Sequence, residues 1–350
     1  MLPTVPMAWH VAFMLFMPFM LSRFGARVLV FAGACTLCTV ACGGSDEGAT
    51  IEPDPEPEAD AVPPASAFLA PEDYDCTASG PFEPPARPHP VDCFADPTCD
   101  GRLVAAHRMG THFAPENSLS ALRASILLGI DIVETDVRLT ADGEVVLIHD
   151  GSVDRTLEGS GDVGAMSLAE IESMPMRANG LAGDFSCDRV PTLDDTFALA
   201  RGRIVVELEV KDTEAGVVAA EYLRDEDLYG SAFLLCSRSE CEAARAAVPD
   251  VPIMSRPKAS TEVAAEIDYD PAPVLVHVDP TEPFLATPIV DAIHGVGAKV
   301  YANAFIDADV IALGGNGFDR YLGMFDDGLD AVQSEVAHYA LVALGRLQPE

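Results

Sequence analysis

Residues 130–150, IDIVETDVRLTADGEVVLIHD, consist of two apolar runs, the first of which contains Glu134 and Asp136. Glu134 and Asp136 are two positions apart, so an extended strand would project both side chains to the same face. An ordinary apolar core penalises two neighbouring carboxylates that have no partner. The second run ends at His149-Asp150. The pattern therefore indicates a polar site with a positive partner for the acids.

Other polar residues also stand at the ends of apolar runs, which places them where barrel enzymes assemble their sites. The full set is His107, Arg108, Glu134, Asp136, His149, Glu209 and Lys211. The three carboxylates among them, Glu134, Asp136 and Glu209, would repel one another if they lay close together. A divalent metal ion bound between them would offset that repulsion. Carboxylate oxygens are hard ligands, so we expect one divalent cation, Ca²⁺ or Mg²⁺, rather than zinc or copper.

The remaining four residues suit the chemistry of a phosphodiester. Imidazoles titrate near neutral pH, so His107 and His149 are candidates for a general acid and a general base. Arg108 and Lys211 supply the positive charge that a bound phosphate needs. Together with a metal ion, this set predicts phosphodiester cleavage.

The elements that must position these residues alternate between strands and helices from residue 101 onward. This alternation over about 245 residues predicts an α/β fold of the (β/α)8 TIM-barrel type. Nine runs qualify as strands, so at least one must be peripheral. A doubly wound sheet is the alternative fold, but no Gly-rich phosphate turn follows the first strand. In RIVVELEVK, residues 203–211, we expect Ile204, Val206, Leu208 and Val210 to face the helices and Val205, Glu207, Glu209 and Lys211 to face the barrel interior.

The overall charge restricts the partners of the protein. Lys+Arg total 21 and Asp+Glu total 56 among 350 residues, a formal net charge of −35. Nucleic acid and anionic membrane surfaces would repel such a chain. We therefore expect no nucleic-acid partner, and a small-molecule substrate drawn by local cations. The oligomeric state is left open.

The N-terminal residues 1–42 are interpreted as a signal segment. Arg23 and Arg27 precede an apolar stretch that ends at Cys42-Gly43-Gly44, which is the layout of an export signal. It resembles a bacterial lipoprotein signal, with Cys42 as the lipidated residue and Met20 as the expected start. We thus expect an exported lipoprotein in the periplasm or at the cell surface that contacts the membrane through this anchor only. A plain secretory signal, an uncleaved anchor and a short membrane span around residues 7–21 are the alternatives.

Residues 43–100 are acidic and Pro-rich, which predicts a stiff linker ahead of a domain at 101–350. Excluding the signal and Cys42, six cysteines remain, an even number that suits an oxidising compartment. Up to three disulfides are possible, and the pairs Cys93–Cys99 and Cys236–Cys241 are close enough for local loops. The cysteines at 76, 93 and 99 suggest that the last third of the linker is pinned to the domain.

The motifs HRMGTHFAPEN, ETD, HDGSVDRT, VPTL and ELEVK occur in this order from residue 107 to residue 211. In this set the chain resembles the glycerophosphodiester phosphodiesterase family, a group of (β/α)8 barrels that hydrolyse deacylated phospholipids. The resemblance spans roughly residues 103–340. It implies metal ligation by Glu134, Asp136 and Glu209, acid–base catalysis by His107 and His149, and phosphate binding by Arg108 and Lys211. It further implies that Glu116 and Asn117 shape the mouth, although Glu116 could simply orient Arg108.

The implied reaction converts a glycerophosphodiester to glycerol 3-phosphate and an alcohol. The chain departs from the family pattern at Met109, which replaces a glycine, at Glu207, which replaces an asparagine, and at Tyr301, which replaces a tryptophan. Glu207 is interpreted as a group behind the ligands, and Asp150 as a cap of the following turn rather than a partner of a neighbouring side chain. Two other functions stay open: a non-catalytic surface binding protein, and a phosphodiesterase that cleaves an intact phospholipid or sphingolipid.

Overall fold

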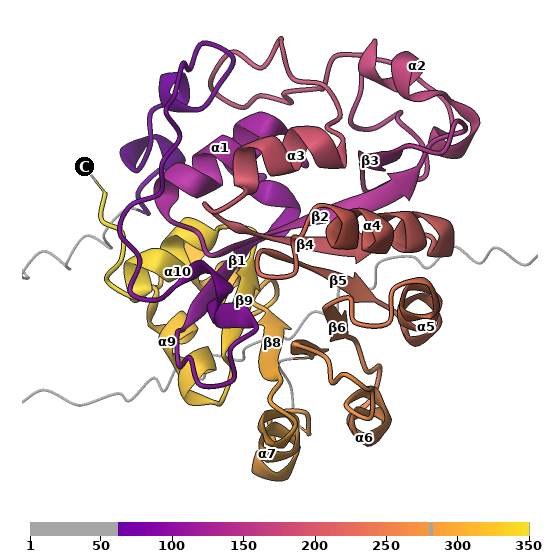
Figure 1. Cartoon of the computed structure of the whole chain (residues 1–350). Coiled ribbons are helices and arrows are strands. Elements are labelled where there is room, and N and C mark those ends of the chain that lie inside the picture. Colours follow the sequence, from indigo (N-terminus) through magenta and orange to yellow (C-terminus); the bar gives the residue numbers. More distant parts are fainter. Residues whose placement is uncertain (1–61, 280–282, 350) are drawn as a thin grey trace, which may run out of the picture. The chain divides into compact units, whose positions relative to one another are not determined.

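The computed structural model describes residues 62–279 and 283–349, and in this part eight parallel strands close into a barrel. Strand β1 pairs with β2 on one side and with β9 on the other, which closes the sheet. The predicted (β/α)8 fold is therefore confirmed (Figure 1). The barrel strands are β1 (Leu103–Ala106), β2 (Ile132–Leu139), β4 (Val205–Val210), β5 (Ala232–Cys236), β6 (Ile253–Ser255), β7 (Leu275–Val278), β8 (Lys299–Asn303) and β9 (Ala331–Ser334).

Helices follow the strands and cover the outside of the barrel. They are α1 (Leu119–Leu128), α3 (Leu193–Ala200), α4 (Thr213–Asp225), α5 (Arg238–Ala247), α6 (Val263–Glu266), α7 (Thr287–Gly295), α8 (Ala308–Leu313), α9 (Asp319–Asp326) and α10 (Ala337–Ala343). Several begin at a side-chain cap: the side chains of Ser118, Thr192 and Asp212 accept backbone N–H groups of the first turns of α1, α3 and α4. Such caps satisfy donors that the helix itself leaves unpaired.

The ninth predicted strand is peripheral. Strand β3 (Val145–Leu147) runs antiparallel to the end of β2, and both extend beyond the barrel. The following excursion, which contains α2 (Leu168–Glu172), has a small apolar core of its own around Val146, Leu157 and Ile171. In Figure 1 this excursion lies beside the far end of β2.

Alternation along β4 places one face toward the helices and the other inside the barrel. Val206, Leu208 and Val210 belong to the core shared with the helices, whereas Val205 packs in the barrel interior. This confirms the predicted faces of the strand. In the parallel register of β2 and β4, Glu134 lies beside Glu207 and Asp136 beside Glu209. The acids of two strands are thus brought to the same level of the barrel.

Residues 62–100 pack against the barrel, so the packed part is longer than the last third of the predicted linker. Their short 3-10 helices are η1 (Ala65–Ala67), η2 (Pro71–Asp73) and η3 (Val91–Phe94). Phe94 is fully buried in the cluster that fills the barrel interior, with its ring centroid 5.2 Å from that of Phe233. Phe68 and Tyr74 are buried against α10 and the segment after β1. Widely spaced aromatic residues among prolines give no periodic signal, which is why the sequence pattern missed this packing.

Three disulfides link the six remaining cysteines: Cys76–Cys187, Cys93–Cys99 and Cys236–Cys241. The two local pairs are those that the sequence favoured. Cys76–Cys187 joins the N-terminal segment to the excursion that follows β3. The signal segment 1–42, Met20, Cys42 and linker residues 43–61 lie outside the described residues. Among the helices that are described, none is long and apolar enough to cross a membrane.

Candidate active site

Three carboxylates carried by β2 and β4 lie close together. Glu134, Asp136 and Glu209 each offer an oxygen within 4.8 Å of the others. Glu134 and Asp136 are completely buried, and Oε1 of Glu134 has no hydrogen-bond partner among the described residues. Burial, with Asp136 and Glu209 nearby, raises the pKa of Glu134 well above its ordinary value. Positive charge is therefore needed at this point if all three groups are to be ionised.

Lys211, at the end of β4, supplies part of that charge. Its Nζ lies 2.9 Å from Oδ1 of Asp136 and 3.0 Å from Oε2 of Glu209. Burial by itself would lower the pKa of Lys211, but Asp136 and Glu209 outweigh it and raise the pKa. Lys211 was predicted to bind phosphate, and the structure brings its ammonium to two of the acids.

The donor set fits one hard divalent cation. All three groups provide oxygen, which suits such ions, and the unpartnered oxygen of Glu134 belongs to the same cluster. Glu207 is not part of it: its Oε2 accepts a 2.7 Å hydrogen bond from the hydroxyl of Tyr301. Burial raises the pKa of Glu207 to about 8. Glu207 therefore lies behind the predicted ligands, as expected, and Tyr301 is its partner.

His107 follows β1 directly and faces the acids. Its Nε2 lies 3.8 Å from Oε2 of Glu134, and its Nδ1 lies 2.8 Å from Oε1 of Glu335. The hydrogen bond from His107 helps to lower the pKa of Glu335, against the effect of burial. An ionised carboxylate only accepts, so Nδ1 of His107 carries a proton and Nε2 is directed toward the site. Glu335 was not predicted, although it stands directly after the last strand, where the other site residues were found.

His149 is oriented in the same manner. Its Nδ1 lies 2.8 Å from Oδ1 of Asp150, whose Oδ2 accepts a 2.6 Å hydrogen bond from Nε of Arg155. These contacts, above all the one with Arg155, hold the pKa of Asp150 well below its usual range. The interpretation of Asp150 as a turn cap was therefore wrong. The residue before His149 donates its N–H to the carbonyl oxygen of Asp136 at 2.9 Å, which places His149 next to the acid-bearing strand.

Arg108 is tied to the acids and to Glu116. Its backbone N–H donates to Oε2 of Glu134 at 2.8 Å, and its Nη1 lies 3.1 Å from Oε1 of Glu116. Arg155 donates two further hydrogen bonds to Glu116, at 2.6 and 2.7 Å. Glu116 therefore orients Arg108, which was one of its two interpretations, and it also orients Arg155.

Asn117 and the turn after His107 border the cluster of acids. Nδ2 of Asn117 donates to Oδ2 of Asp136 at 2.8 Å, and its Oδ1 accepts from the hydroxyl of Thr135 at 2.7 Å. Met109 has a φ of 67°, a left-handed conformation that favours glycine. The departure from the family pattern at Met109 therefore places a buried side chain on strained backbone.

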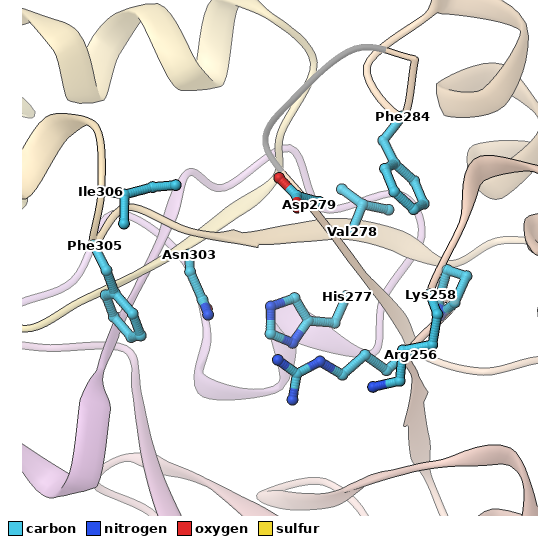
Figure 2. A pocket seen from close by; sticks show the side chains of 10 residues that line it. Arg256, Lys258, His277, Val278, Asp279, Phe284, Asn303, Phe305 and Ile306 are labelled. Carbon is cyan, nitrogen blue, oxygen red and sulfur yellow. The ribbon is translucent and has the colours of Figure 1, made fainter. Parts of the chain in front are cut away.

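A cavity of about 290 Å³ opens beside the acids, at the ends of β6, β7 and β8 (Figure 2). Nη1 of Arg256 lies 3.4 Å from Oε1 of Glu209 and so connects the cavity to the acid cluster. His277, only 5% exposed, and Asn303 form a polar part of the lining, while Phe305 and Ile306 form an apolar part. None of these residues stands in a motif that predicted the site.

Known proteins are similar in sequence to part of this chain. A glycerophosphodiester phosphodiesterase of Caldanaerobacter subterraneus subsp. tengcongensis is 39% identical over 110 residues, 31% of this chain and 45% of that protein. Glycerophosphodiester phosphodiesterase 1 of Mus musculus is 34% identical over 137 residues, 38% of this chain and 41% of that protein. The chain thus spans less than half the length of these relatives.

Solved structures share the fold. A phosphodiesterase of Oleispira antarctica, in complex with the product sn-glycerol-3-phosphate, matches with a TM-score of 0.55 and 26% identity, covering 69% of this chain and 96% of that one. Residues 107–302 match the sequence model of the glycerophosphoryl diester phosphodiesterase family, a span that contains all the predicted site residues except Cys42. The chain belongs to the glycerophosphoryl diester phosphodiesterase family.

Proposed function

We propose that the protein hydrolyses glycerophosphodiesters to glycerol 3-phosphate and an alcohol, with one Ca²⁺ or Mg²⁺ ion bound. The observation that carries this proposal is the convergence of three carboxylates, His107 and His149 at one end of the barrel. The product found in the related Oleispira antarctica structure supports the choice of substrate.

In this proposal Glu134, Asp136 and Glu209 would hold the cation, which when bound supplies positive charge to the phosphate. Arg108 and Lys211 add positive charge on the protein side. Since both imidazoles hold Nδ1 against a carboxylate, each presents Nε2 for proton transfer. One imidazole accepts the proton of the attacking hydroxyl, and the other donates a proton to the oxygen of the departing alcohol.

The test is release of glycerol 3-phosphate from glycerophosphocholine in Ca²⁺ or Mg²⁺, repeated with EDTA. We expect turnover with a divalent cation and loss of turnover with EDTA. Absence of turnover across a panel of diesters, in a protein that still binds the cation, would instead support a non-catalytic binding protein.

The cation site is tested by Glu134→Ala, which removes one predicted ligand. Isothermal titration with Ca²⁺ and Mg²⁺ should show an affinity at least tenfold weaker than in the wild type. Glu172→Ala, on the exposed face of α2, removes one carboxylate elsewhere and serves as the control. Equal affinity in the Glu134 variant and the control would contradict the ligand assignment.

We also propose that the protein is exported and anchored through a lipid on Cys42. The support is the charged and apolar layout of residues 20–44. Growth with a labelled fatty acid should label the wild type but not Cys42→Ser. Label in both proteins would overturn the anchor.

A further inference from the structure

A buried carboxyl group lies behind the turn that presents Glu335 to His107. Asp309, in the first turn of α8, is only 2% exposed. Its Oδ2 accepts a 2.8 Å hydrogen bond from the backbone N–H of Glu335, the residue that directly follows β9. Oε1 of Glu335 in turn lies 2.8 Å from Nδ1 of His107. The contacts therefore run from Asp309 through Glu335 to a predicted catalytic imidazole.

The other oxygen of Asp309 fixes the carboxyl group itself. Oδ1 accepts a 2.6 Å hydrogen bond from the hydroxyl of Tyr321, in α9, and a second one of 2.6 Å from the hydroxyl of Ser334, the last residue of β9. Both donors are fully buried. The elements α8, α9 and β9 therefore meet at this one carboxyl group, and its orientation is fixed.

The segment between β8 and α8 carries a second neighbour of the imidazole. The backbone N–H of Ala304 donates to the carbonyl oxygen of Gln333, in β9, at 2.7 Å. The next residue is Phe305, whose ring centroid lies 4.8 Å from that of His107. Asp309 provides a further link between this segment and the end of β9. A displacement of the segment would therefore disturb both an aromatic and an acidic neighbour of His107.

Packing alone does not explain a carboxyl group at position 309. Its donors are two hydroxyls and one backbone N–H, and among the described residues no cation pairs with it. Burial raises the pKa of Asp309, and the three hydrogen bonds oppose that rise. A buried carboxyl group without a cation is costly, and an apolar side chain would join α8 to β9 at a lower cost. An apolar side chain, however, cannot accept the N–H of Glu335.

We propose that Asp309 is a positioning residue of the active site and acts on His107 through Glu335. This inference rests on the proposed function and adds a residue to it. Asp309 supplies neither a proton nor a ligand to the reaction, but fixes the backbone from which Glu335 reaches the imidazole. A shift of about 1 Å in a catalytic group is enough to lower the rate strongly. The effect falls on kcat, because His107 transfers a proton and is not a predicted phosphate-binding residue.

The experiment is a double-mutant cycle between Asp309 and Glu335. Asp309→Leu keeps the branch at Cγ and removes both acceptor oxygens. It should lower kcat for glycerophosphocholine by about tenfold, with KM within about twofold of wild type. In the Glu335→Ala background the same change should lower kcat by no more than about twofold, because the link to His107 is already broken. Equal losses in the two backgrounds would overturn the proposal.

Asp309→Asn is the conservative variant that should rescue the rate. Its side-chain oxygen can accept the N–H of Glu335, and its two N–H groups can be donated to the hydroxyl oxygens of Tyr321 and Ser334. We expect kcat within about threefold of wild type. A loss as large as that of Asp309→Leu would count against the proposed link through the backbone of Glu335.

Asp75→Leu is the matched control. Asp75 is also a buried carboxyl group, 4% exposed, and it accepts a hydroxyl and the backbone N–H of Thr77 together with the backbone N–H of Asp184. These contacts join the N-terminal segment to the excursion that follows β3. The control should lose thermal stability and keep kcat within about twofold of wild type. A tenfold lower kcat in the control would overturn the specific role of Asp309.

Ser334→Ala replaces Asp309→Leu in the cycle if that variant does not fold. It removes one donor to Asp309 and the acceptor of the N–H of Val336. We expect kcat to fall by about threefold in the otherwise wild-type chain and to stay unchanged in Glu335→Ala. Equal losses in both chains would again overturn the proposal.

NMR of protein labelled with ¹⁵N-histidine gives a readout that does not depend on turnover. The proton on Nδ1 of His107 is assigned by its absence from His107→Ala. Its contact with Glu335 should keep this signal visible in wild type and Asp309→Asn, and the signal should be lost in Glu335→Ala and Asp309→Leu. A signal retained in Asp309→Leu would overturn the proposal. Loss of the signal there, in a protein whose wild type cleaves no diester, would support the link and overturn only the proposed function.

Discussion

At the scale of single residues, the two imidazoles share one design. Each holds Nδ1 at 2.8 Å from a carboxylate oxygen, Glu335 for His107 and Asp150 for His149. Such a contact sets the tautomer and the orientation of the ring. The site therefore contains two different kinds of carboxylate: those gathered at the predicted cation position and those that orient a histidine.

His107→Ala and His149→Ala should each lower kcat by about 10²–10⁴-fold, the usual contribution of a positioned acid or base. Cation affinity should stay within twofold of wild type, because neither change removes a predicted ligand. Release of glycerol 3-phosphate and isothermal titration give the two values. His294→Ala, which changes an exposed histidine paired with Asp330, is the control. Retained turnover in either site variant would refute its assigned role.

Glu335 should act as a positioning residue for His107. Glu335→Gln keeps an acceptor oxygen and loses the charge, whereas Glu335→Ala loses both, so kcat should fall by about tenfold and about a hundredfold respectively. KM and cation affinity should change little in either variant. Steady-state kinetics and titration test this order, and equal kcat in the two variants would argue against a role through His107.

At the scale of elements, α10 and the N-terminal segment share a packed aromatic group. The ring centroid of His338 lies 5.0 Å from those of Phe68 and Phe113 and 5.1 Å from that of His112. Neither ring nitrogen of His338 has a hydrogen-bond partner among the described residues. Burial lowers the pKa of His338 to about 3, so the folded state holds this ring neutral.

The unfolded chain binds a proton at this histidine near pH 6.5 and the folded chain does not, so stability falls as the pH drops from about 6.5 toward 3. Between pH 7.5 and pH 5.0 the loss from His338 is about 2 kcal/mol. His338→Leu should remove that part of the pH dependence, while His112 and all other groups stay the same. Urea unfolding of both proteins at the two pH values measures the difference. An identical pH dependence would show that His338 is protonated in the folded state.

At the scale of the whole molecule, the segment 62–100 packs against the barrel and belongs to the same folded unit. Phe94 is buried within the interior cluster, and the disulfide Cys76–Cys187 links the same segment to the excursion that follows β3. The folded unit therefore begins well before the boundary at residue 101 that composition suggested.

A chain that begins at residue 62 should unfold in one cooperative transition, whereas a chain that begins at residue 101 should lose that transition or melt at least 10 °C lower. Phe94→Ala in the full chain is the milder test and should cost about 3–5 kcal/mol, as for other buried aromatic residues. Thermal and urea unfolding give both values. Equal melting temperatures of the two shortened chains would show that the segment contributes nothing to the fold.

Much of this molecule follows from sequence alone because a strand alternates its side chains with a period of two. That rule assigned the faces of β4 and directed Glu134, Asp136 and Glu209 to one place, and the order of the motifs indicated the family. All nine predicted strands are present, and β3 is the peripheral one. These features depend on local backbone geometry, which a short stretch of sequence already specifies.

Tertiary structure alone decided which side chains meet across the barrel. Glu335 reaches His107 from 228 positions away because β9 pairs with β1, and Arg256 reaches Glu209 from the end of β6. The burial of Phe94 in the barrel interior likewise depends on how distant elements pack. No local period encodes such contacts, because they arise only when the sheet closes and brings the ends of separate strands together.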